Sequence, residues 1–117
     1  MLSRDEIFPI LLLDVPTAPT NLIRMKSTTN SITIRWGLPK ETGNSPIISY
    51  LLEADSSANY RTAVNFTEMG KSQEYEYTFR FLKAKVKYNI RVYAFNKIGK
   101  GDQAMQIYEA VHYIRKG

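Results

Sequence analysis

The side chains that most often carry enzyme chemistry are scarce in this chain. Cysteine is absent, and His112 is the single histidine among the 117 residues. A thiolate nucleophile and a disulfide are therefore excluded, and one histidine without several carboxylate helpers does not make a zinc site. Nucleophilic catalysis needs a nucleophile, a base and an orienting group together, and the sequence offers no such set around His112. We expect a protein that is not an enzyme and that needs no cofactor or metal.

Two carboxylates stand close together in the sequence, at Glu74 and Glu76. A spacing of two places both side chains on the same face of a strand. A glycosidase instead needs two carboxyl groups that oppose each other across a cleft. We interpret Glu74 and Glu76 as charges on a solvated strand face.

A second pattern mixes positive charge with aromatic rings on one stretch of chain. By alternation, five residues share the outward face of a long strand: Lys85, Lys87, Arg91, Tyr93 and Phe95. We expect Leu51 beside them on a neighbouring strand. Aromatic rings and arginine supply rigid contact area and bidentate hydrogen bonds, which suits recognition of another protein. The alternative is an ordinary wet sheet, on which single apolar residues are normal and lysines maintain solubility.

The cations also support a second class of partner. The formal net charge of +5 makes the protein mildly basic, and such proteins are attracted to polyanions. A heparin-like or nucleic-acid polyanion would be bound by a basic strand face and its neighbours, namely Arg80, Lys83, Lys85, Lys87 and Arg91. The sequence holds no nucleic-acid motif, and a net charge of this size is also what ordinary solubility requires.

Alternation with a period of two dominates from residue 22 onward and predicts an all-β protein. In the segment from Ser31 to Trp36, the two isoleucines and the tryptophan share one face. Turn residues cluster between Gly37 and Pro46 and between Asn96 and Gly101. The predicted strands number about seven: 22–26, 31–36, 47–54, 61–68, 74–79, 85–95 and 103–114. That number and spacing are typical of an antiparallel, two-sheet sandwich.

The length of the chain predicts one folded unit with one core. No apolar run is long enough to cross a bilayer, so we expect no membrane span. Residues 1–14 are interpreted as an apolar extension or linker ahead of a domain that covers residues 15–117. The apolar stretch Ile7–Leu13 is too interrupted by Pro9 for a signal peptide, and it is a candidate for self-association.

Several residues in order resemble the fibronectin type III family across Val15–Ile114. Trp36 matches the core tryptophan of the second strand, and the passage from Gly43 to Tyr50 is similar to the Gly-x-x-Pro-Ile-x-x-Tyr run of the family. The segment Leu82–Tyr88 resembles the Leu-x-Pro-x-Thr-x-Tyr tyrosine corner, with Ala84 and Val86 in place of proline and threonine.

The resemblance implies a seven-stranded immunoglobulin-like β-sandwich with a structural core that includes Trp36, Tyr50, Leu82 and Tyr88. It also implies that the Tyr88 ring is buried and its hydroxyl bonds to nearby backbone. Some members display an integrin-binding Arg-Gly-Asp loop, and Lys100-Gly101-Asp102 is predicted to fall in the corresponding last hairpin loop. Because glycine is ordinarily needed in such a turn, the tripeptide is interpreted as a turn former and not as an integrin-binding site.

The predicted role is a non-catalytic protein-interaction or spacer module within a larger modular receptor, adhesion protein or scaffold. Asn65-Phe66-Thr67 is an N-glycosylation acceptor pattern, which matters only if the chain is secreted. The sequence does not decide the compartment, and an extracellular part of a larger protein is slightly favoured over a cytoplasmic one. The identity of the partner is not encoded in any motif.

Overall fold

The computed structural model describes residues 12–57, 60–70 and 72–116. Within these ranges the chain forms strands and turns without a helix. The strands, in chain order, are β1 (Thr20–Ser27), β2 (Ile32–Gly37), β3 (Ser49–Asp55), β4 (Arg61–Phe66), β5 (Glu74–Phe79), β6 (Lys87–Phe95), β7 (Lys100–Glu109) and β8 (Tyr113–Ile114).

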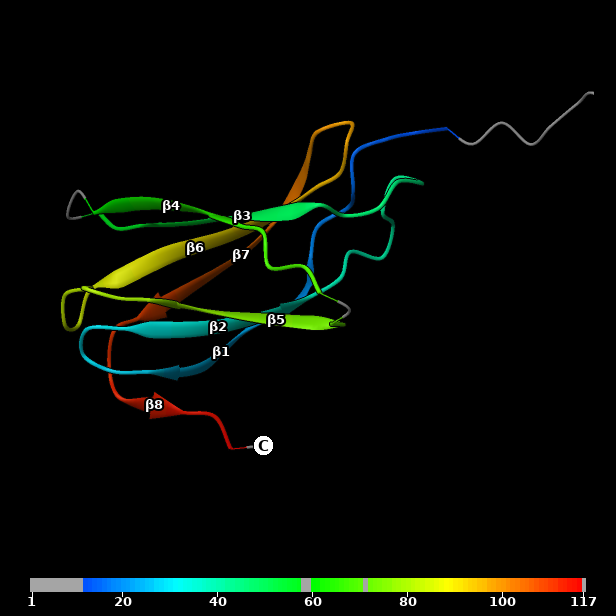
Figure 1. The fold of residues 1–117 in the computed structure, drawn as a ribbon. Helices are drawn as coiled ribbons and strands as arrows, with labels where there is room; N and C mark the ends of the chain where they lie inside the picture. The colour runs from blue at the N-terminus through cyan, green and yellow to red at the C-terminus, as the bar shows by residue number, and fades with distance from the viewer. Residues whose placement is uncertain (1–11, 58–59, 71, 117) are drawn as a thin grey trace, which may run out of the picture.

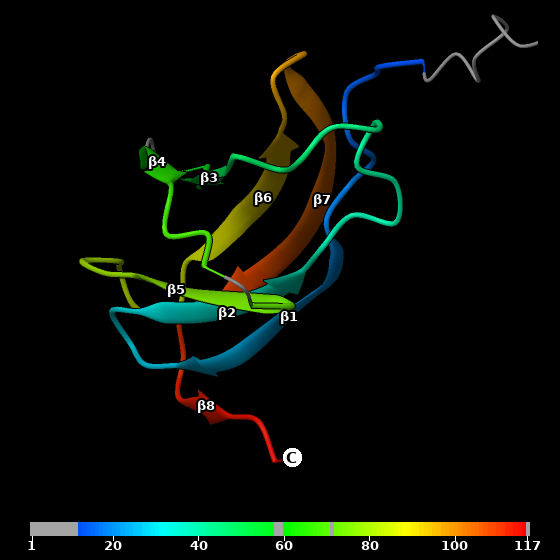
Figure 2. The same ribbon diagram turned by 45° about the vertical axis from the view of Figure 1, so that its right-hand side comes forward.

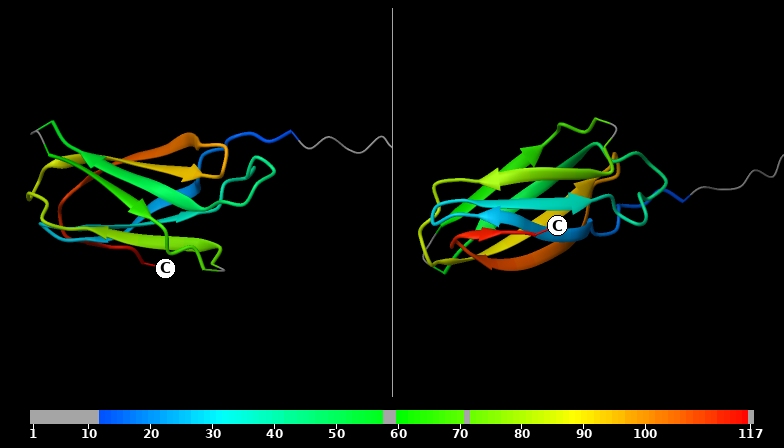
Figure 3. Two further views of the ribbon diagram at one scale, coloured as in Figure 1. Left: turned by 45° about the horizontal axis from the view of Figure 1, so that its top comes forward. Right: turned by 90° about the horizontal axis from the view of Figure 1, so that it is seen from below.

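The strands form two antiparallel sheets that pack face to face (Figures 1 and 2). One sheet has the order β5-β2-β1-β8 and the other has the order β4-β3-β6-β7. Figure 3 shows the ribbon in two further views, one tilted so that its top comes forward and one from below. The predicted all-β antiparallel sandwich is therefore confirmed.

The last predicted strand is two strands in the structure. β7 ends at Glu109, and β8 begins at Tyr113 on the other sheet, where it pairs with the end of β1. The break falls at Ala110, whose N–H donates to the Val86 carbonyl at 3.1 Å. Alternation alone did not reveal this change of sheet, because both segments are β-compatible.

The core lies between the sheets and is built from the inward halves of the alternating strands. Trp36 packs edge-on against Tyr50, with ring centroids 5.5 Å apart, and against Phe66 at 5.2 Å. Trp36 and Tyr50 have no exposed surface. Burial raises the pKa of Tyr50 well above its ordinary value. Such edge-to-face aromatic pairs add to the stabilisation from buried area.

A tyrosine corner joins the two sheets ahead of β6. The Tyr88 ring is fully buried, and its hydroxyl accepts a hydrogen bond from the backbone N–H of Lys83 at 2.8 Å. Leu82 is also buried, and its N–H donates to the Asn30 carbonyl at 2.9 Å. These contacts tie the connection between β5 and β6 to the turn between β1 and β2.

At the other end of the sandwich, Asn96 organises the loops. Its side-chain amide donates to the carbonyls of Asp14 at 2.6 Å and Thr42 at 2.8 Å, and its Oδ1 accepts from the N–H groups of Ile98 and Gly99. The turn between β6 and β7 is therefore Asn96–Gly99. Asn96 thereby fixes the segment around Asp14 and the loop around Thr42 to this turn.

Two predictions about this region are wrong. Lys100-Gly101-Asp102 is the start of β7 and not part of the hairpin loop. Gly101 is buried against Pro16, and a Cβ at this position would lie 2.1 Å from the Pro16 carbonyl oxygen. The close packing of β7 against Pro16 therefore requires glycine. The predicted strand 47–54 begins too early, because β3 starts at Ser49, and Ile48 ahead of it is 55% exposed.

The apolar stretch Ile7–Leu13 lies largely outside the described residues. Leu12 and Leu13, which are described, are exposed. Self-association through residues 7–13 and the boundary at residue 14 stay predictions.

Candidate functional site

The outer face of the β4-β3-β6-β7 sheet carries most of the residues predicted to bind a partner. In the register of this sheet, Arg91 stands between Glu53 on β3 and Met105 on β7. One step along, Tyr93 stands between Leu51 and Gln103. Because cross-strand partners share a face, these side chains form one surface, which we call the outer face.

An ion-pair cluster lies at the centre of the outer face. Arg91 Nε contacts Glu53 Oε1 at 3.1 Å, and Arg91 Nη2 contacts Asp55 Oδ2 at 2.8 Å. Asn89 donates from Nδ2 to Asp55 Oδ1 at 3.1 Å. The hydrogen bond between Arg91 and Asp55 lowers the pKa of the Asp55 carboxyl group and raises the pKa of the Arg91 guanidinium. Arg91 is thus held in place and its charge is satisfied within the chain.

Apolar and aromatic groups surround this cluster. Met105 is 48% and Ile107 is 55% exposed, while Leu51, Tyr93 and Phe95 are half-buried. The Tyr93 hydroxyl donates to Gln103 Oε1 at 3.0 Å, and Lys100 Nζ lies 4.6 Å from the centroid of the Tyr93 ring. The ring is therefore fixed between two β7 side chains.

Met105 and Ile107 were not among the predicted binding residues. They stand opposite Arg91 and Asn89, so they belong to the outer face. The sequence could have predicted them only with the register between β6 and β7, which shows which β7 residues share the face of Arg91.

The two lysines of the predicted set lie at the edge of the outer face or beyond it. Lys87 is the first residue of β6 and stands opposite Glu109. Lys85, predicted to be part of the long strand, is in a turn before β6 with φ of 61°. The prediction that Lys85 lies in the strand is wrong. The alternation of residue types extends to Lys85, but the backbone there is not extended.

The predicted polyanion set is also divided by the structure. Arg91 is engaged by Glu53 and Asp55, which leaves it no free charge on the strand face. Arg80, Lys83 and Lys85 lie in the connection between β5 and β6 and are exposed. The basic character therefore gathers at the end of the sandwich and not on the strand face.

The remaining candidates have ordinary surroundings. Glu76 Oε1 accepts from Arg35 Nη2 at 2.7 Å, and Glu74 lies 3.9 Å from the same guanidinium. Asn65 is exposed on β4, where glycosylation stays a prediction. In the part of the chain that the structure describes, histidine and acidic side chains form no cluster that could hold a metal ion. Among those same residues, no helix is long and apolar enough to cross a membrane.

Two facing antiparallel sheets, a buried tryptophan on β2 and a tyrosine corner before β6 define the class of immunoglobulin-like β-sandwiches. A sequence model described as the fibronectin type III domain matches residues 17–110. The chain belongs to the fibronectin type III domain family.

Comparisons with individual proteins agree with this assignment. Titin of Drosophila melanogaster is 35% identical over 92 residues, which cover 77% of this chain and, to the nearest percent, 0% of titin. Cardiac-type myosin-binding protein C of Homo sapiens is 34% identical over 99 residues, or 83% of this chain and 8% of that protein. A solved structure of titin domains aligns with a TM-score of 0.69 at 24% identity, covering 85% of this chain and 33% of that one. The chain therefore spans only a small part of the length of these relatives.

Proposed function

We propose that this chain is a non-catalytic module that recognises another protein through the outer face of the β4-β3-β6-β7 sheet, as part of a larger modular protein. The observation that carries the proposal is the composition of that face. Exposed Met105 and Ile107, together with Leu51, Tyr93 and Phe95, surround an arginine whose charge is already satisfied.

The chemistry of such a surface favours protein contact over polyanion contact. Protein interfaces are enriched in aromatic residues, methionine and arginine, and their centres are depleted of free charge. Arg91 needs no acidic group from a partner, because Glu53 and Asp55 already neutralise it. A partner would therefore meet rings and aliphatic groups on a rigid sheet, and its affinity would change little with salt.

The relatives support the idea of a module. Titin and myosin-binding protein C are much longer than the segment that this chain matches. The lack of cysteine and of a second histidine supports a non-catalytic role. A receptor, adhesion protein or scaffold would each use a module of this kind.

The test is site-specific photocrosslinking in the parent protein. A crosslinking amino acid at Met105 should capture a partner protein, whereas the same group at Glu76, on the other sheet, should capture none. Met105→Glu combined with Ile107→Glu should abolish binding of the captured partner while leaving the melting temperature within a few degrees, because both side chains are exposed. A module that only spaces its neighbours would give equal and unspecific crosslinks from both sheets, which would contradict the proposal.

A further inference from the structure

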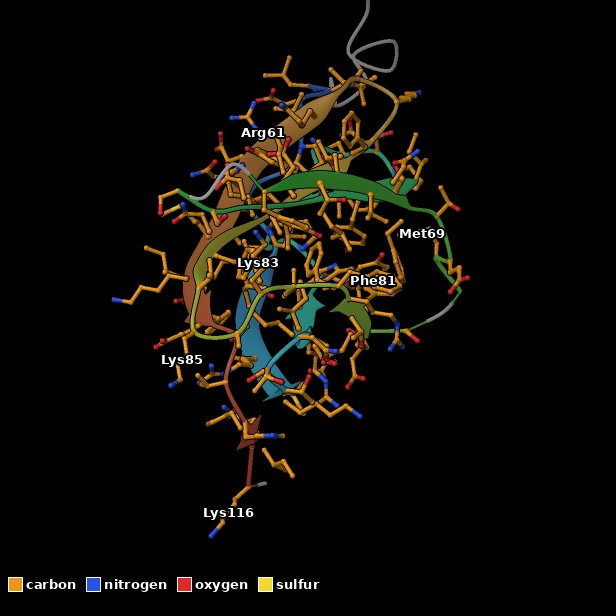
Figure 4. The ribbon with its side chains drawn as sticks, turned by 90° about the vertical axis from the view of Figure 1, so that its left-hand side faces the viewer. Arg61, Met69, Phe81, Lys83, Lys85 and Lys116 are labelled. Atoms are coloured by element: carbon orange, nitrogen blue, oxygen red, sulfur yellow. The ribbon has the colours of Figure 1, made fainter. Side chains whose placement is uncertain are left out.

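The connection from Arg80 to Val86, which we call the basic corner, forms one end of the sandwich. It is fixed to the neighbouring turns by backbone hydrogen bonds, from Leu82 N–H to the Asn30 carbonyl at 2.9 Å and from Lys85 N–H to the Ala110 carbonyl at 3.0 Å. Figure 4 looks onto this end, where Phe81, Lys83 and Lys85 are labelled. The end is made of the turns that connect the strands, and the basic corner contributes Arg80, Lys83 and Lys85 to it.

The basic corner holds two residues in a backbone conformation that does not suit them. Phe81 has φ of 62° and Lys85 has φ of 61°. Elsewhere in the described part of the chain, every residue with positive φ is an asparagine or a glycine. A left-handed conformation is costly for other residues, and strain of this kind often marks a functional position.

The side chains at these two positions make no core contacts that would offset the strain. Phe81 is 89% exposed, the largest exposure of any bulky apolar side chain in the described ranges, and Lys85 is also exposed. An asparagine or glycine would satisfy the backbone at either position without losing core contacts. The fold therefore does not explain why a phenylalanine and a lysine stand there.

The charged residues nearest to Phe81 in the sequence are all cations, whereas the larger hollow that Phe81 and Arg80 also line includes Glu68 and Glu76. Arg80, Lys83 and Lys85 are exposed beside Phe81, and the sequence contains no acidic residue between Glu76 and Asp102. At the opposite end of the sandwich the charges are mixed, since Lys40 and Lys97 stand among Asp14, Glu41 and Asp102.

A small hollow adjoins the exposed ring. It has a volume of about 450 Å³ and is lined by Thr28, Asn30, Ser31, Arg80 and Phe81. Hydroxyl and amide groups next to a guanidinium are suited to hold a phosphate or carboxylate headgroup. An apolar ring, lysines and a polar hollow therefore lie at the same end of the sandwich.

We propose that the basic corner binds the surface of an anionic lipid membrane, with the Phe81 ring inserted among the headgroups and acyl chain ends. Lysines near a bilayer are attracted to anionic lipid, and an apolar side chain that enters the interface adds binding energy. Lys83 and Lys85 act as compact point charges, which suit a diffuse negative surface more than paired recognition of one carboxylate. This site is separate from the outer face.

The test is co-sedimentation of the whole chain with lipid vesicles at low salt. The chain should pellet with vesicles in which about one third of the lipid is phosphatidylserine and the rest phosphatidylcholine, and should stay in solution with pure phosphatidylcholine. Lys83→Glu combined with Lys85→Glu should weaken binding at least about tenfold. Lys40→Glu combined with Lys97→Glu changes the net charge equally at the opposite end and should leave binding within about twofold, because charges there are far from the bilayer.

Phe81 is tested separately from charge. Phe81→Asn removes the ring and suits the left-handed backbone, so it should keep the fold while weakening vesicle binding about tenfold. In Phe81→Trp, tryptophan emission should shift to shorter wavelength when phosphatidylserine vesicles are added. Lys97→Trp is the matched control, and its emission should not shift. In both variants Trp36 contributes the same buried background.

Four results would overturn the proposal. The first is that the chain does not pellet with phosphatidylserine vesicles. The second is that the charge reversal at the opposite end weakens binding as much as the reversal at the basic corner. The third is that Phe81→Asn binds as tightly as the unchanged chain. In the fourth, soluble heparin or polyglutamate would bind through Lys83 and Lys85 while vesicles did not, which would assign the corner to an acidic polymer.

Discussion

At one end of the sandwich the chain places Gly43 and Asn44 at positions with positive φ, whereas at the other end it places Phe81 and Lys85 there. Glycine adopts this conformation freely, and asparagine tolerates it. The first end is also closed by the hydrogen bonds of Asn96 to Asp14 and Thr42. The Asn96 end is therefore built from residues that stabilise it, whereas the basic corner carries side chains that stability does not require.

The largest effect is expected from Gly43→Ala. A Cβ at this position would lie 1.9 Å from the Asp14 carbonyl oxygen, at a φ of 77°. Overpacking and left-handed strain together should lower the free energy of unfolding by about 3 kcal/mol. Urea denaturation followed by tryptophan fluorescence measures the loss.

Gly70→Ala is the matched control for that variant. Gly70 also has positive φ, of 46°, but nothing lies within 4 Å of its added Cβ. Its cost should be limited to about 1 kcal/mol of backbone strain. Equal losses in the two variants would show that the Asn96 end is not tightly fitted.

A smaller loss is expected from Asn96→Ala. The variant leaves the carbonyls of Asp14 and Thr42 without their donor, and the N–H groups of Ile98 and Gly99 without their acceptor. The expected loss is about 2–3 kcal/mol, since buried groups without partners are costly. Asn96→Asp keeps the acceptor but turns a buried carboxylate oxygen toward the two carbonyl oxygens, so at neutral pH it should melt no higher than Asn96→Ala. An Asn96→Ala variant that melts with the unchanged chain would contradict the role of this side chain.

Tyr88→Phe probes the other end through a single hydrogen bond. It removes the hydroxyl that accepts from the Lys83 N–H at 2.8 Å while keeping the buried ring. We expect a loss of about 1 kcal/mol, because Lys83 is near the surface and water can replace the acceptor. Faster amide exchange at Lys83 should accompany the loss, and unchanged exchange there would refute the bond.

The smallest effect, and the one of opposite sign, is expected from Phe81→Asn and Lys85→Asn. Each relieves left-handed strain without removing core contacts, so each should raise the free energy of unfolding by about 0.5–1 kcal/mol. Denaturation midpoints measure the change. A clear loss of stability in Phe81→Asn would mean that the ring packs within the module, and the contrast between the two ends would then fail.

Much of the fold could be read from the sequence because alternation marks strands that are buried on one side. The segments around Trp36, Tyr50 and Tyr75 kept their predicted faces, and the tyrosine corner was implied by the resemblance of Leu82–Tyr88 to the motif of the family. Strand ends were less accurate. The position of Ile48 and the start of β7 at Lys100 depend on loop contacts with Phe95 and Pro16, which local pattern does not contain.

The candidate site was harder to predict for a different reason. Arg91 and its two acidic partners lie far apart in sequence, and only the register between β3 and β6 brings them together. Without that register, the sequence predicts Arg91 as a free cation on a basic strand face. Likewise, the backbone conformation of Phe81 and Lys85 could not be predicted, because neither residue type signals positive φ.

The hydrogen bonds near the amino-terminal end of the module also set its response to force. Asn44 holds the Leu12 carbonyl at 2.9 Å, Asp14 N–H holds the Gly43 carbonyl at 3.1 Å, and Thr17 N–H holds the Glu41 carbonyl at 3.0 Å. Tension applied at Leu12 would load these bonds one after another before it reached β1. The module should therefore yield first by a short, stepwise peeling at low load, and the sandwich itself should rupture only afterwards.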